Sequence, residues 1–158
     1  MRFFRILQIL VAGILITNLT ACGFTPVYGT NSQSAQTLSN IQIAPPNTRN
    51  EYLFVSKLEE RLGRNPNAGI RLKYNIHIFS EGLEVFGASR AQRVGIVRYR
   101  LISLDDDTLL AKSSVRNFVG YDPGNSFYGG AKRDATERLI QTLVDKTVTD
   151  IIIKLQAN

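Results

Sequence analysis

The sequence predicts an α+β domain, a two-layer sandwich in which two helices pack on one face of a four-stranded, mostly antiparallel sheet. Three observations support this prediction. Residues 70–78 alternate apolar and polar side chains, as a half-buried strand does. Two further extended stretches follow them. Apolar residues also recur every three or four positions in two separate stretches, as they do in amphipathic helices.

The first expected elements lie between residues 41 and 63. The segment 41–43 alternates and stops at Pro45-Pro46, which indicates a short edge strand. Thr48 and Glu51 have the spacing of a capping box, in which each side chain bonds the other residue's backbone amide. The helix that they begin ends at Gly63. Its apolar stripe consists of Phe54, Val55, Leu58 and Leu62.

Three strands joined as a meander are expected next. In residues 70–78, the odd positions 71 to 77 are polar and point to one face of the strand. The even positions point to the other face and are apolar: Ile70, Leu72, Tyr74, Ile76 and Ile78. A loop with Gly82 and Gly87 leads to a second strand over residues 94–104. The three aspartates 105–107 form a turn, because short carboxylates bond their own backbone there. The third strand covers residues 109–119.

A long amphipathic helix is expected over residues 131–155, after an irregular loop at 120–130 that is rich in Tyr and Phe. At about 1.5 Å per residue it would be about 37 Å long. Its apolar stripe consists of Ala135, Leu139, Ile140, Leu143, Val144, Val148, Ile151, Ile152 and Leu155. The apolar face of the sheet is the natural cover for this stripe.

The N-terminus has the order of a secretory signal peptide. Arg2 and Arg5 precede an apolar run that ends at Leu19, and the small residue Ala21 stands directly before Cys22. A cysteine at this point indicates a bacterial lipoprotein signal, with cleavage before Cys22 and lipid on its thiol. The alternative is a single transmembrane anchor, but the run is shorter than the about 20 residues that span a bilayer.

These boundaries divide the chain into a signal peptide over 1–21, a lipidated N-terminus and linker over 22–40, and one domain over 41–158. Two or more acyl chains, such as palmitate, hold a protein stably at a membrane. Cys22 is followed by Gly23 and not by Asp, which retains many Gram-negative lipoproteins at the inner membrane. The expected location is therefore the periplasmic side of the outer membrane.

The sequence offers few groups for catalysis. Cys22 is the only cysteine and His77 the only histidine, so neither an activated nucleophile nor a zinc site is expected. The aspartates 105–107 lack the ligand spacing of a calcium loop. We expect no enzyme, no metal and no cofactor besides the lipid on Cys22. An envelope hydrolase that uses carboxylates elsewhere stays open as an alternative.

Charge is the most informative feature of the predicted sheet. The net charge of +6 falls to +4 once Arg2 and Arg5 are removed, and the three strand bodies contain no acidic residue. Such a face either solvates the sheet and discourages edge pairing, or it meets anions. In an exported protein the expected anions are acidic surface partners and the phosphates of lipopolysaccharide, not nucleic acid. The basic residues are Arg71, Lys73, Arg98, Arg100, Lys112 and Arg116.

The segment Cys22–Gly29, with the sequence Cys-Gly-Phe-Thr-Pro-Val-Tyr-Gly, resembles the mature start of the LPS-assembly lipoprotein family LptE in its alphaproteobacterial form. The element order and the chain length continue this likeness. The resemblance implies a lipoprotein that plugs the lumen of the β-barrel LptD, supports its assembly and helps deliver lipopolysaccharide to the outer leaflet. The alternative is a basic periplasmic lipoprotein that scaffolds another envelope complex.

The resemblance also implies lipopolysaccharide-binding residues. Family members bind this lipid through basic side chains near the middle hairpin and before the last helix. The corresponding positions are Arg90, with Arg93, and Lys132, with Arg133. The last two stand at a helix start, where the helix dipole favours acids over bases.

Overall fold

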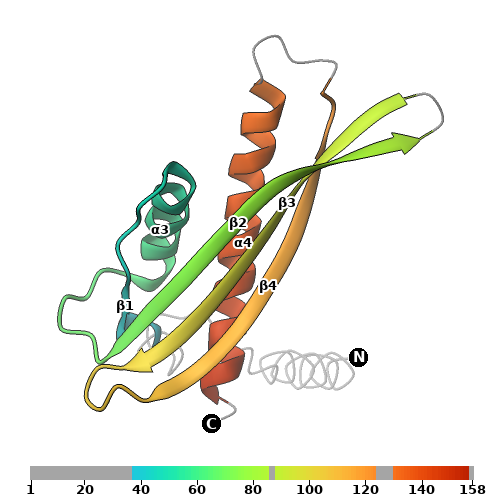
Figure 1. Cartoon of the computed structure of the whole chain (residues 1–158). Coiled ribbons are helices and arrows are strands. Elements are labelled where there is room, and N and C mark those ends of the chain that lie inside the picture. Colours follow the sequence, from blue (N-terminus) through green and yellow to red (C-terminus); the bar gives the residue numbers. More distant parts are fainter. Residues whose placement is uncertain (1–36, 86–87, 124–129, 157–158) are drawn as a thin grey trace, which may run out of the picture. The chain divides into compact units, whose positions relative to one another are not determined.

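The computed structural model describes residues 37–85, 88–123 and 130–156. The signal peptide, Cys22 and the segment that carries the family resemblance lie outside this part of the chain. The elements are β1 (Ile41–Ile43), α3 (Arg49–Leu62), β2 (Ile70–Val85), β3 (Ala88–Ser103), β4 (Leu109–Tyr121) and α4 (Gly130–Gln156). The sheet has the order β1-β2-β3-β4; β1 is parallel to β2 and the other pairs are antiparallel. The predicted α+β sandwich is confirmed (Figure 1).

Helix α3 has the boundaries that its local sequence predicts. The Glu51 amide donates to the Thr48 hydroxyl, and the Glu51 carboxylate accepts from the Thr48 amide at 3.2 Å, which completes the capping box. Gly63 ends the helix with φ of 83°, a conformation that suits glycine. The four predicted apolar residues of the stripe are the buried residues of this helix.

The alternation of side chains gives β2, β3 and β4 two different faces. On the helix face, Leu72, Tyr74 and their cross-strand partners on β3 pack against α3 and α4. The Tyr74 ring lies 5.5 Å from the Phe54 ring of α3, and the Tyr99 hydroxyl donates to Asp150 of α4 at 2.8 Å. Both helices therefore cover the same face. We call the other side the open face.

Helix α4 approaches β3 closely at Gly95. A Cβ atom at this position would lie 2.6 Å from Leu143 Cδ1 and 3.1 Å from Leu139 Cδ2, so only glycine leaves the helix this room. The buried residues of α4 include the predicted stripe except Leu155, which is half-buried, and also Thr136 and Thr147. Each of these hydroxyls donates to the carbonyl four residues earlier and is thereby satisfied.

Helix α4 is 27 residues long, and its buried side chains form the largest share of the core. Within the described residues, no helix combines the length and the hydropathy that crossing a membrane requires. Arg61 of α3 forms an ion pair with Asp145 of α4 at 2.8 Å, which joins the two helices at the surface.

The strands are longer than predicted, and this is the main correction to the expected fold. β2 continues to Val85 and β3 begins at Ala88, so the expected loop around Gly82 is a paired hairpin in which Gly82 lies opposite Ala91. Figure 1 shows this hairpin extending beyond the rest of the sheet. Cross-strand hydrogen bonds hold these residues extended although their own sequence does not alternate. Arg90 and Arg93 consequently lie on a strand.

The chain before β1 also contacts the domain. Leu38 is buried in the main core, and the Asn40 side chain accepts from the Gly69 amide at 2.7 Å. The end of the expected linker is thus part of the packed structure.

The aspartate turn between β3 and β4 is confirmed. Asp106 accepts from both the amide and the hydroxyl of Thr108, and hydrogen bonds from Ser103 and Thr108 lower the pKa of Asp106. Asp107 adopts a left-handed φ of 56°. These local bonds hold the Asp106 carboxylate within the turn.

Of two tyrosines on the helix face, one hydroxyl has a hydrogen-bond partner and the other has none among the described residues. The Tyr99 hydroxyl bonds Asp150, and burial together with that bond raises the pKa of Tyr99 above its ordinary value. The Tyr74 hydroxyl is buried without a hydrogen-bond partner among the described residues. Burial, followed by the charge of Glu51, raises the pKa of Tyr74 to about 12, so this hydroxyl stays neutral.

This difference predicts different responses to removal of the hydroxyl group. Tyr74→Phe should leave the free energy of unfolding unchanged or raise it by about 1 kcal/mol, because an unpaired buried hydroxyl is removed. Tyr99→Phe should lower it by about 1.5–3 kcal/mol, because the Asp150 carboxylate loses its donor. Urea unfolding of the two variants beside the unchanged protein measures both effects. Equal losses in the two variants would contradict this account.

Candidate functional site

The open face brings all six basic sheet residues together. The sequence assigned them to faces of individual strands, and the pairing of the strands places Arg71, Lys73, Arg98, Arg100, Lys112 and Arg116 on one side of the sheet. Every one of these side chains is exposed. The face is therefore a continuous cationic surface built from three strands.

The register of the strands orders these residues into rows across the sheet. Lys73 pairs with Arg100, and Arg100 pairs with Lys112, so three cations lie directly side by side. Neighbouring strands are about 4.8 Å apart, so the Cα atoms of this row span only about 10 Å. We call this row the cation row. Like charges that face each other across strands destabilise a sheet.

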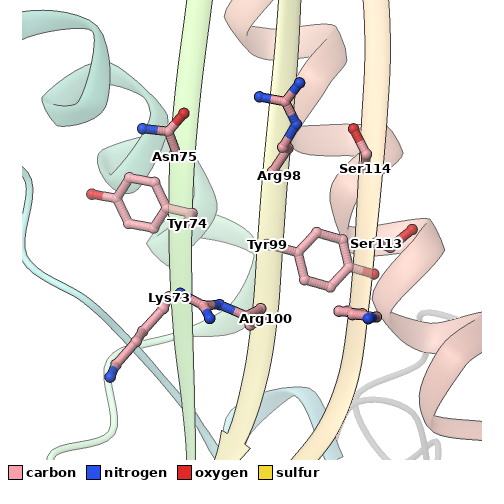
Figure 2. A pocket seen from close by; sticks show the side chains of 9 residues that line it. Lys73, Tyr74, Asn75, Arg98, Tyr99, Arg100, Ser113 and Ser114 are labelled. Atoms are coloured by element: carbon pink, nitrogen blue, oxygen red, sulfur yellow. The ribbon is translucent and has the colours of Figure 1, made fainter.

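The cation row borders a groove of about 660 Å³ on the open face (Figure 2). The adjacent row adds Asn75, Arg98 and Ser114, which supply an amide, a guanidinium and a hydroxyl. Figure 2 also labels Tyr74, Tyr99 and Ser113, which alternate with these residues along the strands. The groove thus presents hydrogen-bond donors of several kinds within two neighbouring rows.

Acidic partners are scarce on this face. Among the described residues, Glu81 is the one acidic side chain on the open face of the strands; its carboxylate accepts from Gln92 at 2.7 Å and lies 3.8 Å from Arg116. Glu81 is in the part of β2 that the sequence assigned to a loop. It lies several rows away from the cation row, which has no acidic partner among the described residues.

An apolar row crosses the same face nearer the hairpin. Phe79 pairs with Val94, and Val94 pairs with Phe118. No helix among the described residues covers this side, yet Val94 is completely buried, while Phe118 remains 62% exposed. Between the two rows, His77 lies beside Phe79 with 5.4 Å between the ring centroids. Sequence reasoning missed this apolar row, although the consecutive apolar residues Ile78 and Phe79 interrupt the alternation of β2 and could have indicated it.

Arg90 and Arg93 lie on opposite faces of β3. Arg90 is exposed on the open face, whereas Arg93 points to the helix face and is half-buried. The Arg93 guanidinium donates to the Thr136 hydroxyl at 3.1 Å and to the Ser80 hydroxyl at 2.8 Å. Arg93 thus joins the hairpin to the beginning of α4, and its guanidinium is held by these contacts.

Lys132 and Arg133 are both exposed in the first turn of α4. This turn contains no acidic residue, so two cations stand where the helix dipole already provides positive charge. Thr136, which contacts Arg93, also donates to the Lys132 carbonyl. The contact through Thr136 therefore places the start of α4 beside β3 near Arg93.

The remaining chemistry of the described residues is limited. His77 is exposed on the open face, as the alternation predicts, and no three residues among His, Cys, Asp and Glu within this part of the chain gather closely enough to hold a metal ion. The arrangement on the open face is suited to binding anions through charge-assisted hydrogen bonds.

Known structures share this fold. A candidate lipoprotein from Caulobacter crescentus superposes with a TM-score of 0.67 and 20% identity, covering 80% of this chain and 97% of that one. A minor lipoprotein from Acinetobacter baumannii superposes with a TM-score of 0.54 and 10% identity, and the match covers 72% of this chain and 90% of that one. A protein from Xanthomonas campestris superposes with a TM-score of 0.51 and 16% identity, and the match covers 68% of this chain and 61% of that one. No family model and no curated protein sequence matches the chain.

The cation row predicts that removing its central charge stabilises the fold. Arg100→Gln should raise the free energy of unfolding by about 0.5 kcal/mol at low salt, because it relieves two cross-strand repulsions. The gain should shrink as salt screens the charges. Chemical unfolding at two ionic strengths measures it.

Arg138→Gln is the matched control, since it removes one exposed charge from α4, one helical turn from Asp134. This control should give no gain. A loss of stability in Arg100→Gln would mean that Arg100 has a structural role in the sheet.

Proposed function

We propose that this protein is an outer-membrane lipoprotein that plugs and supports assembly of the LptD β-barrel and binds lipopolysaccharide during its transport to the outer leaflet. Lipid on Cys22 would hold it on the periplasmic side of that membrane. The role is one of binding and support, not of catalysis. The observation that carries the proposal is the cationic open face, whose six exposed basic residues have one acidic neighbour among the described residues.

Three further findings support this proposal. The N-terminal sequence has the order of a lipoprotein signal and resembles the mature start of the LptE family. The fold is shared with a candidate lipoprotein and a minor lipoprotein. Exposed cations also stand at both predicted lipopolysaccharide-binding positions, Arg90 on the hairpin and Lys132 at the start of α4.

The proposed mechanism uses the strength of charge-assisted hydrogen bonds. Arginine and lysine side chains bond phosphate oxygens more strongly than neutral donors do. Lipopolysaccharide carries phosphates on its lipid A and core sugars, and these groups would exchange their contacts within an aggregate for contacts with the protein. Aggregated lipopolysaccharide would thereby be loosened as it enters the barrel.

The partner is tested by affinity purification of the lipidated protein from detergent-solubilised outer membranes of the native host. We expect one large β-barrel protein in near-equal amount, identified by mass spectrometry. A barrel that encloses the protein has to be stoichiometric with it. Recovery of a different envelope complex, with no barrel, would overturn the plug and favour a basic lipoprotein that scaffolds that complex.

The lipid-binding residues are tested by Arg90→Asp combined with Lys132→Asp. Each loses a charge-assisted bond of about 1.5–3 kcal/mol, so lipopolysaccharide should bind at least about tenfold more weakly. The circular dichroism spectrum should not change, because both side chains are exposed and an acid suits the first turn of α4.

The matched control is Arg49→Asp combined with Arg138→Asp, which reverses the same charge on exposed helix positions. This control should retain lipopolysaccharide binding. Undiminished binding in the Arg90 and Lys132 variant would show that these two positions are not the binding site.

A further inference from the structure

The cation row lies far from the residues that the family resemblance assigns to lipid binding. Arg100 and Arg90 are ten residues apart on the same strand, which corresponds to about 33 Å at about 3.3 Å per residue. A single phosphate group cannot contact both positions. The cation row therefore needs an explanation of its own.

The row has the features of a binding site for a group with more than one phosphate oxygen. Lys73, Arg100 and Lys112 are adjacent by register and have no acidic partner among the described residues. The neighbouring Asn75 and Ser114 add neutral donors, and the groove of about 660 Å³ gives the anion room between them (Figure 2). A phosphate bound here would neutralise charges that otherwise repel one another.

The apolar row indicates what else the bound molecule contains. Val94 lies six residues from Arg100 on β3, so the two rows are about 20 Å apart along the strand. The hydrocarbon of one membrane leaflet is about 15 Å deep, half of about 30 Å. A lipid that lies along β3 would therefore place its headgroup on the cation row and the end of its acyl chain on Phe79 and Phe118. Between the two rows its chain would pass Ile96, which is flanked by the exposed Arg98 and Arg116.

An acidic protein fits this face less well. A protein surface that presents only carboxylates would match the cations but would leave Phe118, which is 62% exposed, without an apolar contact. A free phosphate compound would likewise occupy only the cation row. A phosphorylated lipid uses both rows at once.

We propose that the open face is a second lipid-binding site, in which a phosphorylated amphiphile lies along β2, β3 and β4 with its phosphate on Lys73, Arg100 and Lys112 and its acyl chain on the accessible side chains of the apolar row, Phe79 and Phe118. The inference rests on the proposed function only in taking a lipid as the molecule that reaches this face. It is independent of Arg90 and Lys132.

The test uses the full-length protein in a neutral detergent and a phosphatidic acid probe with a photoreactive group at the end of one acyl chain. After illumination, mass spectrometry identifies the labelled peptides. We expect the label on the strands that carry Phe79 and Phe118. A phosphatidylcholine probe with the same chains should label these strands at least about tenfold less, because its headgroup carries a compensating positive charge.

The variant that removes the row is Lys73→Gln with Arg100→Gln and Lys112→Gln, and it should reduce labelling at least about tenfold. All three side chains are exposed, so the fold should survive, which circular dichroism checks. The matched control is Arg49→Gln with Arg138→Gln and Lys154→Gln, which removes three exposed charges from the helices and should label normally.

Three outcomes would overturn the inference. The first is labelling that the triple variant leaves unchanged, and the second is labelling spread over the helices. The third is displacement of the probe by pyrophosphate at concentrations as low as those of unlabelled phosphatidic acid. That third outcome would indicate a site for free phosphate compounds. Recovery of the barrel without labelling of the strands would overturn this site alone. Labelling of the strands without any barrel would keep the site and overturn the plug.

Discussion

The fold depends on the packing of two helices against the same face of one sheet. Helix α4 lies close to β3 because Gly95 has no side chain, and α3 covers β2 through the contact between Phe54 and Tyr74. Side chains of a strand alternate between faces, so this packing decides the environment of every residue on β2, β3 and β4. A shift of one residue in the register would place the basic side chains in the core.

Local sequence patterns predicted most of the fold. The capping box at Thr48, the glycine at position 63 and the alternation over residues 70–78 depend on near neighbours, and the structure confirms each of them. The hairpin beyond Ile78 was predicted as a loop because Gly82 and the polar residues around it weaken the pattern. Pairing between two strands stabilises such residues, and the alternation within one strand does not show that Gly82 will pair with Ala91.

The candidate site could be predicted only in part for the same reason. Each strand shows by itself that its basic residues share a face, but the alignment of Lys73, Arg100 and Lys112 depends on the register. The register between β3 and β4 follows the turn at residues 105–107 and the irregularity beyond Leu101, where Ile102 pairs with Leu109. The separate register between β2 and β3 places Lys73 opposite Arg100. Arg90 and Arg93 are three residues apart, so an extended strand places them on opposite faces; the sequence placed them in a loop, where this rule does not apply.

The positive charges of Arg100 and Arg90 lie far apart on the open face of β3. Arg100 belongs to the cation row, Val94 to the apolar row, and Arg90 lies beyond both toward the hairpin. The about 33 Å between the two arginines is several times the Debye length of about 8 Å at physiological ionic strength. A charge at one end therefore has little effect at the other, and substitutions at the two ends should add independently. Because the apolar row lies between them, the proposed lipid would have its phosphate on the cation row and its acyl chain directed toward the hairpin. The register supports this direction because it places Phe79 and Phe118 on the hairpin side of the cation row.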